Sequence, residues 1–152
     1  GFQERFSNKT AIAPTASISI ICGGASPGVE PIAANSYTHK TLSGSFNVRN
    51  RYLEEILDGH GKNDDETWST ITTNQGSVSH LDFLTDLEKD VFKTAFELNQ
   101  KWIIELSGDR TPFMSQAQSV NLVLPADVHK KELHRIHFDA WKKGLKSLYY
   151  CR

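Results

Sequence analysis

The sequence contains little that would mark a secreted, membrane-bound or nucleic-acid-binding protein. It has two cysteines in 152 residues, too few for a disulfide framework, which agrees with a reducing compartment. No apolar run reaches the roughly 18 residues of a membrane-spanning helix, and the first residues lack the pattern of a signal peptide. The 17 Lys and Arg balance 18 Asp and Glu, for a formal net charge of -1. We therefore expect a cytoplasmic protein without membrane or nucleic-acid partners.

The remaining composition is that of a globular chain. With 38% apolar and 23% charged residues over 152 positions, it has the length of one domain. A domain of this size buries about 68–70% of its unfolded surface. The chain starts at Gly1 without an initiator methionine and stops abruptly at Cys151-Arg152. We interpret residues 1–152 as part of one domain of a longer polypeptide.

Strand-like and helix-like segments follow one another along the chain, which is typical of the α/β class. The expected strands cover residues 10–22, 118–124 and 145–151, and residues 30–50 are expected to be irregular around a turn at Leu42-Ser43-Gly44. The expected helices cover residues 51–57, 64–73, 85–108 and 127–143. A capping box, Thr85 to Glu88, opens the third helix, and Gly144 stands where the fourth should end. The closing order of helix, strand, helix and strand is that of the wall of an α/β barrel.

Residues 24–28, Gly-Ala-Ser-Pro-Gly, match the G-x-S-x-G pattern of a hydrolase nucleophile elbow. That elbow needs a backbone N–H on the residue after the serine, to bind the oxyanion, and a helix behind it. Pro27 has no N–H, and Pro31 follows four residues later. We therefore interpret the motif as a turn, and we exclude Ser26 as a nucleophile.

Histidine and cysteine do not form a metal-ligand pattern in this sequence. His134 and His137 share an expected helix, but no Glu lies between them, and the two cysteines are far apart. We expect no metal in this chain. Cys22 follows an apolar stretch, where a free cysteine usually behaves as a small buried hydrophobe, and only Arg152 could make Cys151 reactive. Both cysteines are expected to be structural.

Two groups of residues have the composition of a functional site. Residues 14–19, Pro-Thr-Ala-Ser-Ile-Ser, combine small side chains, hydroxyls and accessible backbone amides ahead of the pair Gly23-Gly24, and such donors suit phosphate oxygens even without a lysine. A Ser/Thr-rich strand is the alternative. Tyr149 and Tyr150 place two phenols side by side, and a phenol can pass an electron together with a proton. The alternative there is one core tyrosine and one exposed tyrosine.

Six motifs follow one another in order over essentially the whole chain. They are residues 13–17 (APTAS), 26–31 (SPGVEP), 41–44 (TLSG), 92–97 (FKTAFE), 116–121 (QAQSVN) and 141–150 (WKKGLKSLYY). Together they resemble the C-terminal part of the large subunit of class I ribonucleotide reductase. Within that family the resemblance is to the versions carried by T-even-type bacteriophages.

The resemblance implies the C-terminal portion of a ten-stranded α/β barrel. It also implies an enzyme that reduces ribonucleoside diphosphates to deoxyribonucleoside diphosphates by radical chemistry. The loop that holds the substrate diphosphate would comprise Thr15, Ala16, Ser17 and Ile18. Many relatives carry a hydroxyl residue at the last of these positions, where this chain can offer only a backbone amide. Tyr149 and Tyr150 match the paired tyrosines that relay the radical from the small subunit to the catalytic cysteine.

The same resemblance implies that much of the machinery lies outside this chain. The catalytic cysteines, the allosteric ATP and deoxynucleotide sites, and the tail that reacts with thioredoxin or glutaredoxin have no counterpart here, and Cys22 and Cys151 match none of the redox cysteines. No cofactor is expected in this chain. The implied partners are the N-terminal part of the large subunit, the small subunit with its metal and tyrosyl radical centre, and the ribonucleoside diphosphate substrate. The chain would be inactive alone, in the host cytoplasm if it is phage-encoded. The alternative is a non-catalytic nucleotide-binding or subunit-interaction module that keeps the fold.

Overall fold

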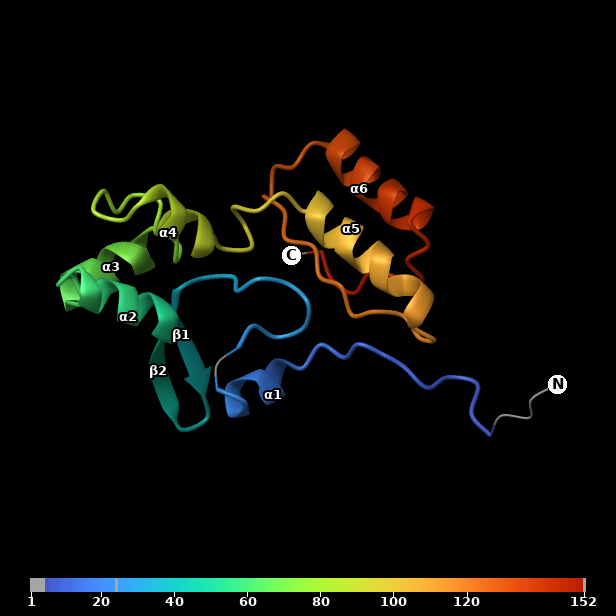
Figure 1. Ribbon diagram of the computed structural model, residues 1–152, viewed down its shortest axis with the longest axis horizontal. Helices are drawn as coiled ribbons and strands as arrows, with labels where there is room; N and C mark the ends of the chain where they lie inside the picture. The colour runs from blue at the N-terminus through green and yellow to red at the C-terminus, as the bar shows by residue number, and fades with distance from the viewer. Residues whose placement is uncertain (1–4, 24, 152) are drawn as a thin grey trace. The chain divides into compact units, whose positions relative to one another are not determined.

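The computed structural model describes residues 5–23 and 25–151, without the side chain of Thr41 (Figure 1). Contacts divide the chain into two compact units, the first from residues 1–30 with 99–152 and the second from Pro31–Leu98. Each unit has its own buried apolar cluster. The predicted phosphate loop and the tyrosine pair both belong to the first unit.

The second unit is a β-hairpin followed by three helices (Figure 1). Strand β1 (Ser36–Thr41) pairs antiparallel with strand β2 (Gly44–Arg49) in a register that places Ser36 opposite Arg49. The helices are α2 (Arg51–Gly59), α3 (Asp65–Thr73) and α4 (Asp86–Val91). Their N-caps are Asn50, Asp64 and Thr85, each of which accepts a backbone N–H from the first helical turn.

The core of the second unit comes from the apolar faces of α2 and α3. Leu53 and Leu57 lie four residues apart on α2 and, like Ile71 on α3, are completely buried. Trp68 completes the α3 face of this cluster. The other buried members are Val78, Leu81, Leu84 and Phe92. The core therefore joins the apolar faces of α2 and α3, and α3 also contacts β1.

The first unit is built from helices and extended chain. Its helices are α1 (Ala16–Ile21), α5 (Lys101–Arg110), the 3-10 helix η1 (Thr111–Phe113) and α6 (Lys130–Lys142). Helices α5 and α6 lie side by side (Figure 1). Their contact buries Ile104 with Ile136 and Ala140, together with Leu122.

Three extended segments of the first unit pair in parallel. Ile12 lies opposite Gln118, and Leu122 lies opposite Cys151. The middle of the three, residues 116–123, is the central segment, and it is bonded on both sides. Its backbone N–H groups donate to the carbonyls of residues 10 and 12 in the first segment, over 3.0 and 3.1 Å. Two further backbone hydrogen bonds, each of 2.8 Å, join it to residues 149 and 150 in the third segment. The three segments therefore run in the same direction.

The strand expected over residues 10–22 is wrong beyond Ile12. Pro14 and the left-handed Thr15 (φ 44°) end the extended run, and α1 begins directly after them. The apolar residues that suggested a buried strand lie exposed on α1 instead: Ile18, Ile20 and Ile21. The irregular stretch expected over residues 30–50 is also wrong, because it contains the β-hairpin. Its predicted turn is confirmed as the loop that joins β1 to β2.

The long helix expected over residues 85–108 is divided into α4 and α5. Its capping box is confirmed, since Thr85 and Glu88 form both reciprocal bonds. The break covers residues 92–100, and within it the Thr94 backbone N–H and hydroxyl both donate to the Glu97 carboxylate over 2.8 Å. The next N–H, from Ala95, goes to a carbonyl outside the helix. Local side-chain bonds of this kind compete with helix continuation.

The remaining predicted elements are found in part. The helices over 51–57 and 64–73 are confirmed as α2 and α3, and the last helix is α6, which starts at Lys130 rather than Asp127. Gly144 follows it at φ 78°, as a C-terminal glycine should. The strands over 118–124 and 145–151 are reduced to the isolated bridges of the central segment. Within residues 5–23 and 25–151 the one regular sheet is the antiparallel hairpin. The α/β class is therefore confirmed only in the general sense that helices and strands both occur.

Candidate functional site

The predicted phosphate loop is the turn into α1. Thr15 has left-handed backbone angles (φ 44°, ψ 24°) and is the N-cap, and the first helical bond runs from the Ser19 N–H to the Thr15 carbonyl over 2.9 Å. The N–H groups of Ala16, Ser17 and Ile18 therefore have no acceptor inside the helix. All three residues are exposed. A left-handed residue followed by helical ones directs successive N–H groups to one concave site, which suits an anion.

A turn over residues 26–30 supports this loop. The Gly28 N–H donates to Thr15 Oγ1 over 2.9 Å, and Gly28 has φ 75°, a conformation that favours glycine. The Ser26 hydroxyl donates to the Glu30 carbonyl, and no helix follows. The interpretation of the G-x-S-x-G motif as a turn is confirmed for these residues, while Gly24 lies outside the described part of the chain.

Glu30 connects the turn to the central segment. Its side chain is buried, with 7% of the residue exposed, and Oε1 accepts the backbone N–H of Asn121. The sequence patterns did not single out Glu30 or Asn121 as site residues. The position of Glu30 between Val29 and Pro31 could have indicated this role. A charged side chain in so constrained a turn needs a hydrogen-bond partner.

The tyrosine pair lies at the third extended segment. The ring centroids of Tyr149 and Tyr150 are 4.3 Å apart, with 53° between the ring planes. Backbone bonds of 2.8 Å hold both residues to the central segment, from the Tyr149 N–H to the Val120 carbonyl and from the Leu122 N–H to the Tyr150 carbonyl. The two tyrosines are 49% and 51% exposed. The alternative of one core and one exposed tyrosine is therefore wrong.

The three extended segments run in the same direction, and each predicted site lies at or just beyond the end of one of them. Ile12 lies opposite Gln118, and the first segment ends a few residues later at Thr15. Leu122 lies opposite Cys151, and the tyrosine pair is bonded to residues 120 and 122. Both predicted sites thus lie toward the carboxyl ends of parallel segments, where ligands bind in parallel α/β proteins.

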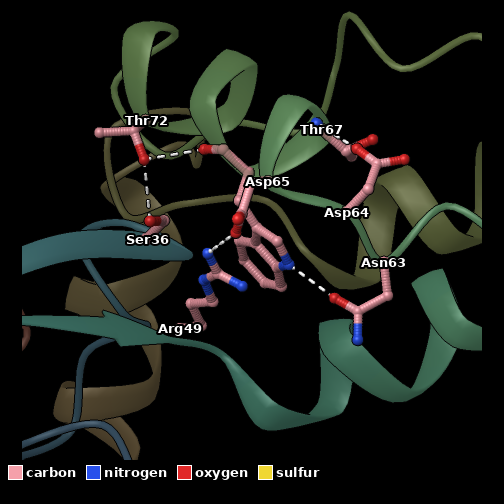
Figure 2. A network of polar contacts seen from close by, with 8 residues as sticks. Ser36, Arg49, Asn63, Asp64, Asp65, Thr67 and Thr72 are labelled. Carbon is pink, nitrogen blue, oxygen red and sulfur yellow. Dashed lines mark hydrogen bonds and ion pairs between the residues drawn. The ribbon is translucent and has the colours of Figure 1, made fainter.

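The second unit contains a separate polar cavity of about 450 Å³ between the hairpin and α3. Beside it, Arg49 forms an ion pair of 2.8 Å with Asp65, and the Ser36 and Thr72 hydroxyls bond over 2.9 Å (Figure 2). Arg49 also stands 5.0 Å above the Trp68 ring. These polar groups are bonded to one another. None of the predicted site residues lines this cavity, and we assign no function to it.

The two histidines that share a predicted helix, His134 and His137, both lie on α6. Among residues 5–23 and 25–151, no three His, Cys, Asp or Glu side chains come together as metal ligands. His134 stacks on Phe138 with ring centroids 5.9 Å apart, and His137 Nδ1 lies 2.8 Å from the Leu133 carbonyl oxygen. These contacts are those of packed surface histidines.

The two cysteines are both exposed. The prediction of a buried Cys22 is wrong, because this residue ends the exposed helix α1 rather than a buried strand. Cys151 closes the third extended segment. None of the helices among the described residues has the length and apolar content needed to span a bilayer.

Comparison with known proteins links this geometry to one family. The family model described as "Ribonucleotide reductase, barrel domain" matches residues 4–151. The ribonucleoside-diphosphate reductase large subunit of Invertebrate iridescent virus 6 is 53% identical over 156 residues, which cover 100% of this chain and 16% of that protein. The subunit alpha of Chlamydia trachomatis is 39% identical over 142 residues, or 93% of this chain and 13% of its own length.

A solved structure agrees with these sequence relatives. The alpha subunit of Actinobacillus ureae class Id ribonucleotide reductase superposes with a TM-score of 0.80 at 37% identity, covering 92% of this chain and 25% of that one. The chain therefore spans a quarter or less of these three relatives.

Proposed function

Because the chain belongs to the ribonucleotide reductase barrel-domain family, we propose that it acts as the C-terminal part of a ribonucleoside-diphosphate reductase large subunit. The complete enzyme reduces ribonucleoside diphosphates to deoxyribonucleoside diphosphates by radical chemistry. The single observation that carries the proposal is the match over residues 4–151. The parallel pairing of the central segment on both edges supports a place in the wall of a ten-stranded α/β barrel.

The loop of Thr15, Ala16, Ser17 and Ile18 holds the substrate diphosphate in this proposal. Its first-turn N–H groups lack helical partners, and no acidic residue lies in the first turn of α1 to repel an anion. Ile18 contributes its backbone N–H, since its side chain has no donor. The Thr15 hydroxyl already accepts the Gly28 N–H, so it supports the loop in addition to any bond it donates to phosphate.

Tyr149 and Tyr150 carry the radical in this proposal. One phenol loses an electron and its O–H proton while the neighbouring tyrosyl radical gains both, so the radical moves by one residue and no charge builds up. Ring centroids 4.3 Å apart keep the two phenols close enough for this exchange. The bonds to Val120 and Leu122 fix the backbone of both residues, which holds the pair in one geometry.

The other parts of the enzyme come from outside this chain in the proposal. The remainder of the large subunit supplies the catalytic and reducing cysteines, the allosteric nucleotide sites and the tail for thioredoxin or glutaredoxin. The small subunit supplies the oxidising equivalent from its metal and tyrosyl radical centre. The assembled enzyme works in the cytoplasm, of the host where the gene is viral.

A binding measurement tests the phosphate loop. In the assembled large subunit, Ser17→Asp should weaken binding of a ribonucleoside diphosphate strongly, because its carboxylate meets the diphosphate. Ser17→Ala removes at most one donor, worth about 1.5–3 kcal/mol if it bonds a charged group. Ser43→Asp adds the same charge at the exposed hairpin loop and should bind like wild type. Equal affinities for wild type and Ser17→Asp would remove the phosphate assignment.

A reconstitution experiment tests the proposed function as a whole. The chain is mixed with the remainder of the large subunit and the small subunit, and deoxyribonucleoside diphosphate is measured. We expect product only when all three are present. An assembled complex that binds substrate but makes no product would favour a non-catalytic nucleotide-binding or interaction module.

A further inference from the structure

Glu30 is a buried acidic residue in a position where its burial needs a reason. Only 7% of the residue is exposed, and placing a carboxylate away from water is costly unless it is hydrogen-bonded. It is held at two points: its carbonyl accepts the Ser26 hydroxyl, and its carboxylate accepts the Asn121 N–H. These partners lie on different segments of the first unit, the turn that supports the phosphate loop and the central segment.

The turn side of Glu30 leads directly to the phosphate loop. A Cβ added to Gly28 would lie 2.9 Å from Glu30 Oε2, so the carboxylate packs against the bare glycine backbone. The same glycine donates its N–H to Thr15 Oγ1 over 2.9 Å. Thr15 is the left-handed residue that starts α1. Glu30 thus packs against the glycine that bonds the residue at the start of the phosphate loop.

The other side of Glu30 leads to the tyrosine pair. Asn121 lies between Val120 and Leu122, the two residues whose backbone groups bond Tyr149 and Tyr150. A carboxylate that holds the Asn121 N–H is thus one residue away from both of these bonds. Within the first unit, Glu30 joins the supporting turn of one predicted site to the segment that supports the other.

We propose that Glu30 is a positioning residue for substrate binding, which fixes the diphosphate loop to the central segment through the Asn121 N–H. The inference rests on the proposed function, because it takes Thr15 to Ile18 as the substrate loop. Glu30 touches neither substrate nor radical. Its contribution is a charge-assisted hydrogen bond between two elements that are 91 residues apart in sequence.

Three variants of the assembled enzyme test this role by steady-state kinetics. Glu30→Ala removes the bond and should raise KM for the ribonucleoside diphosphate on the order of tenfold, with a smaller change in kcat, because a displaced loop binds substrate poorly. Glu30→Gln keeps an acceptor oxygen and should recover most of the KM. Glu105→Gln, which loses a carboxylate that pairs with Lys143 in the same unit, should match wild type. A KM for Glu30→Ala within about twofold of wild type, or no recovery in Glu30→Gln, would overturn the proposal.

Hydrogen exchange separates this proposal from the proposed function. In the full chain, Glu30→Ala should speed exchange of the Asn121 and Ser19 amides together, whereas Glu105→Gln should leave both unchanged. Faster exchange at both amides in Glu30→Ala supports the positioning role, whether or not the wild-type assembly forms product. Failure of the wild-type assembly to form product would count against the proposed function alone. Unchanged exchange at Ser19 in Glu30→Ala would overturn the positioning role.

Discussion

Replacing Asn35 with alanine should destabilise the second unit strongly. Asn35 is 1% exposed and directly precedes β1. Its Nδ2 donates to the carbonyls of Gly76 and Phe92 over 2.9 and 2.7 Å, and its Oδ1 accepts Nδ2 of Asn50 over 2.9 Å. One amide therefore ties the base of the hairpin to the turn after α3 and to the end of α4.

The cost of Asn35→Ala follows from these three bonds. At about 0.5–1.5 kcal/mol each, their loss is worth roughly 1.5–4.5 kcal/mol. The Gly76 carbonyl keeps the Asn35 backbone N–H at 3.1 Å, but the Phe92 carbonyl loses its side-chain donor, which adds about 1–3 kcal/mol if no water replaces it. Because the bond to the Phe92 carbonyl is counted in both contributions, we expect a loss of about 3–5 kcal/mol, a large part of the 5–15 kcal/mol typical of a domain.

Urea unfolding of the full chain, followed by circular dichroism, measures this loss. The control is Asn47→Ala, which removes an exposed asparagine of the same hairpin whose Oδ1 accepts the Thr38 hydroxyl at 3.1 Å, and which should cost less than about 1 kcal/mol. Asn35→Asp keeps the size but turns an acceptor toward two carbonyls, so it should be at least as damaging as alanine. A loss below about 1 kcal/mol for Asn35→Ala, or wild-type stability for Asn35→Asp, would refute the reasoning.

Acid should weaken the start of α4. The His60 imidazole and the backbone at the helix start lower the pKa of Glu88 from 4.5 to about 2, so their stabilisation is complete above about pH 4.5 and is lost as the pH falls toward 2. The Tm difference between wild type and Glu88→Gln should therefore shrink as the pH falls from about 4.5 toward 2, and a constant difference would contradict it. Gly76→Ala should cost about 2–4 kcal/mol in urea unfolding, because Gly76 has φ 81° and its Cβ would meet the Ala34 Cβ at 2.3 Å. Gly59→Ala has open space within 4 Å and should cost nothing, so equal stability of the two variants would refute the steric argument.

Features set by neighbours in sequence could be predicted from it. The capping box of Thr85 and Glu88 forms because both partners lie within one helical turn, and Gly144 ends α6 because glycine accepts a positive φ. The division of the expected long helix was missed although its cause is equally local. The apolar spacing typical of a helix continues through Thr94. The hydrogen bonds of Thr94 to the Glu97 carboxylate compete with helix continuation, so the helix does not extend across this region.

Features set by distant contacts could not be predicted from patterns. The sequence left two arrangements of Tyr149 and Tyr150 open, because adjacent residues of an extended segment normally point to opposite sides. The ring contact of 4.3 Å selects the side-by-side arrangement. Sequence patterns place Glu30 only within the motif over residues 26–31, because its partner Asn121 lies 91 residues away. The hairpin could not be predicted for a different reason. Its Ser, Thr, Asn and Gly content is typical of a loop, and few of its side chains are buried.

Deoxyribonucleotide formation by Tyr149→Phe and Tyr150→Phe in the assembled enzyme tests the central claim most directly. Phenylalanine keeps the ring and its packing but has no phenolic proton, so a neutral tyrosyl radical cannot form at that position. We predict that each variant melts and binds ribonucleoside diphosphate like wild type while its turnover falls to background. Tyr37→Phe, at a 45% exposed tyrosine of the hairpin, should keep full turnover. Substantial turnover by Tyr149→Phe or Tyr150→Phe would contradict the relay role of that residue.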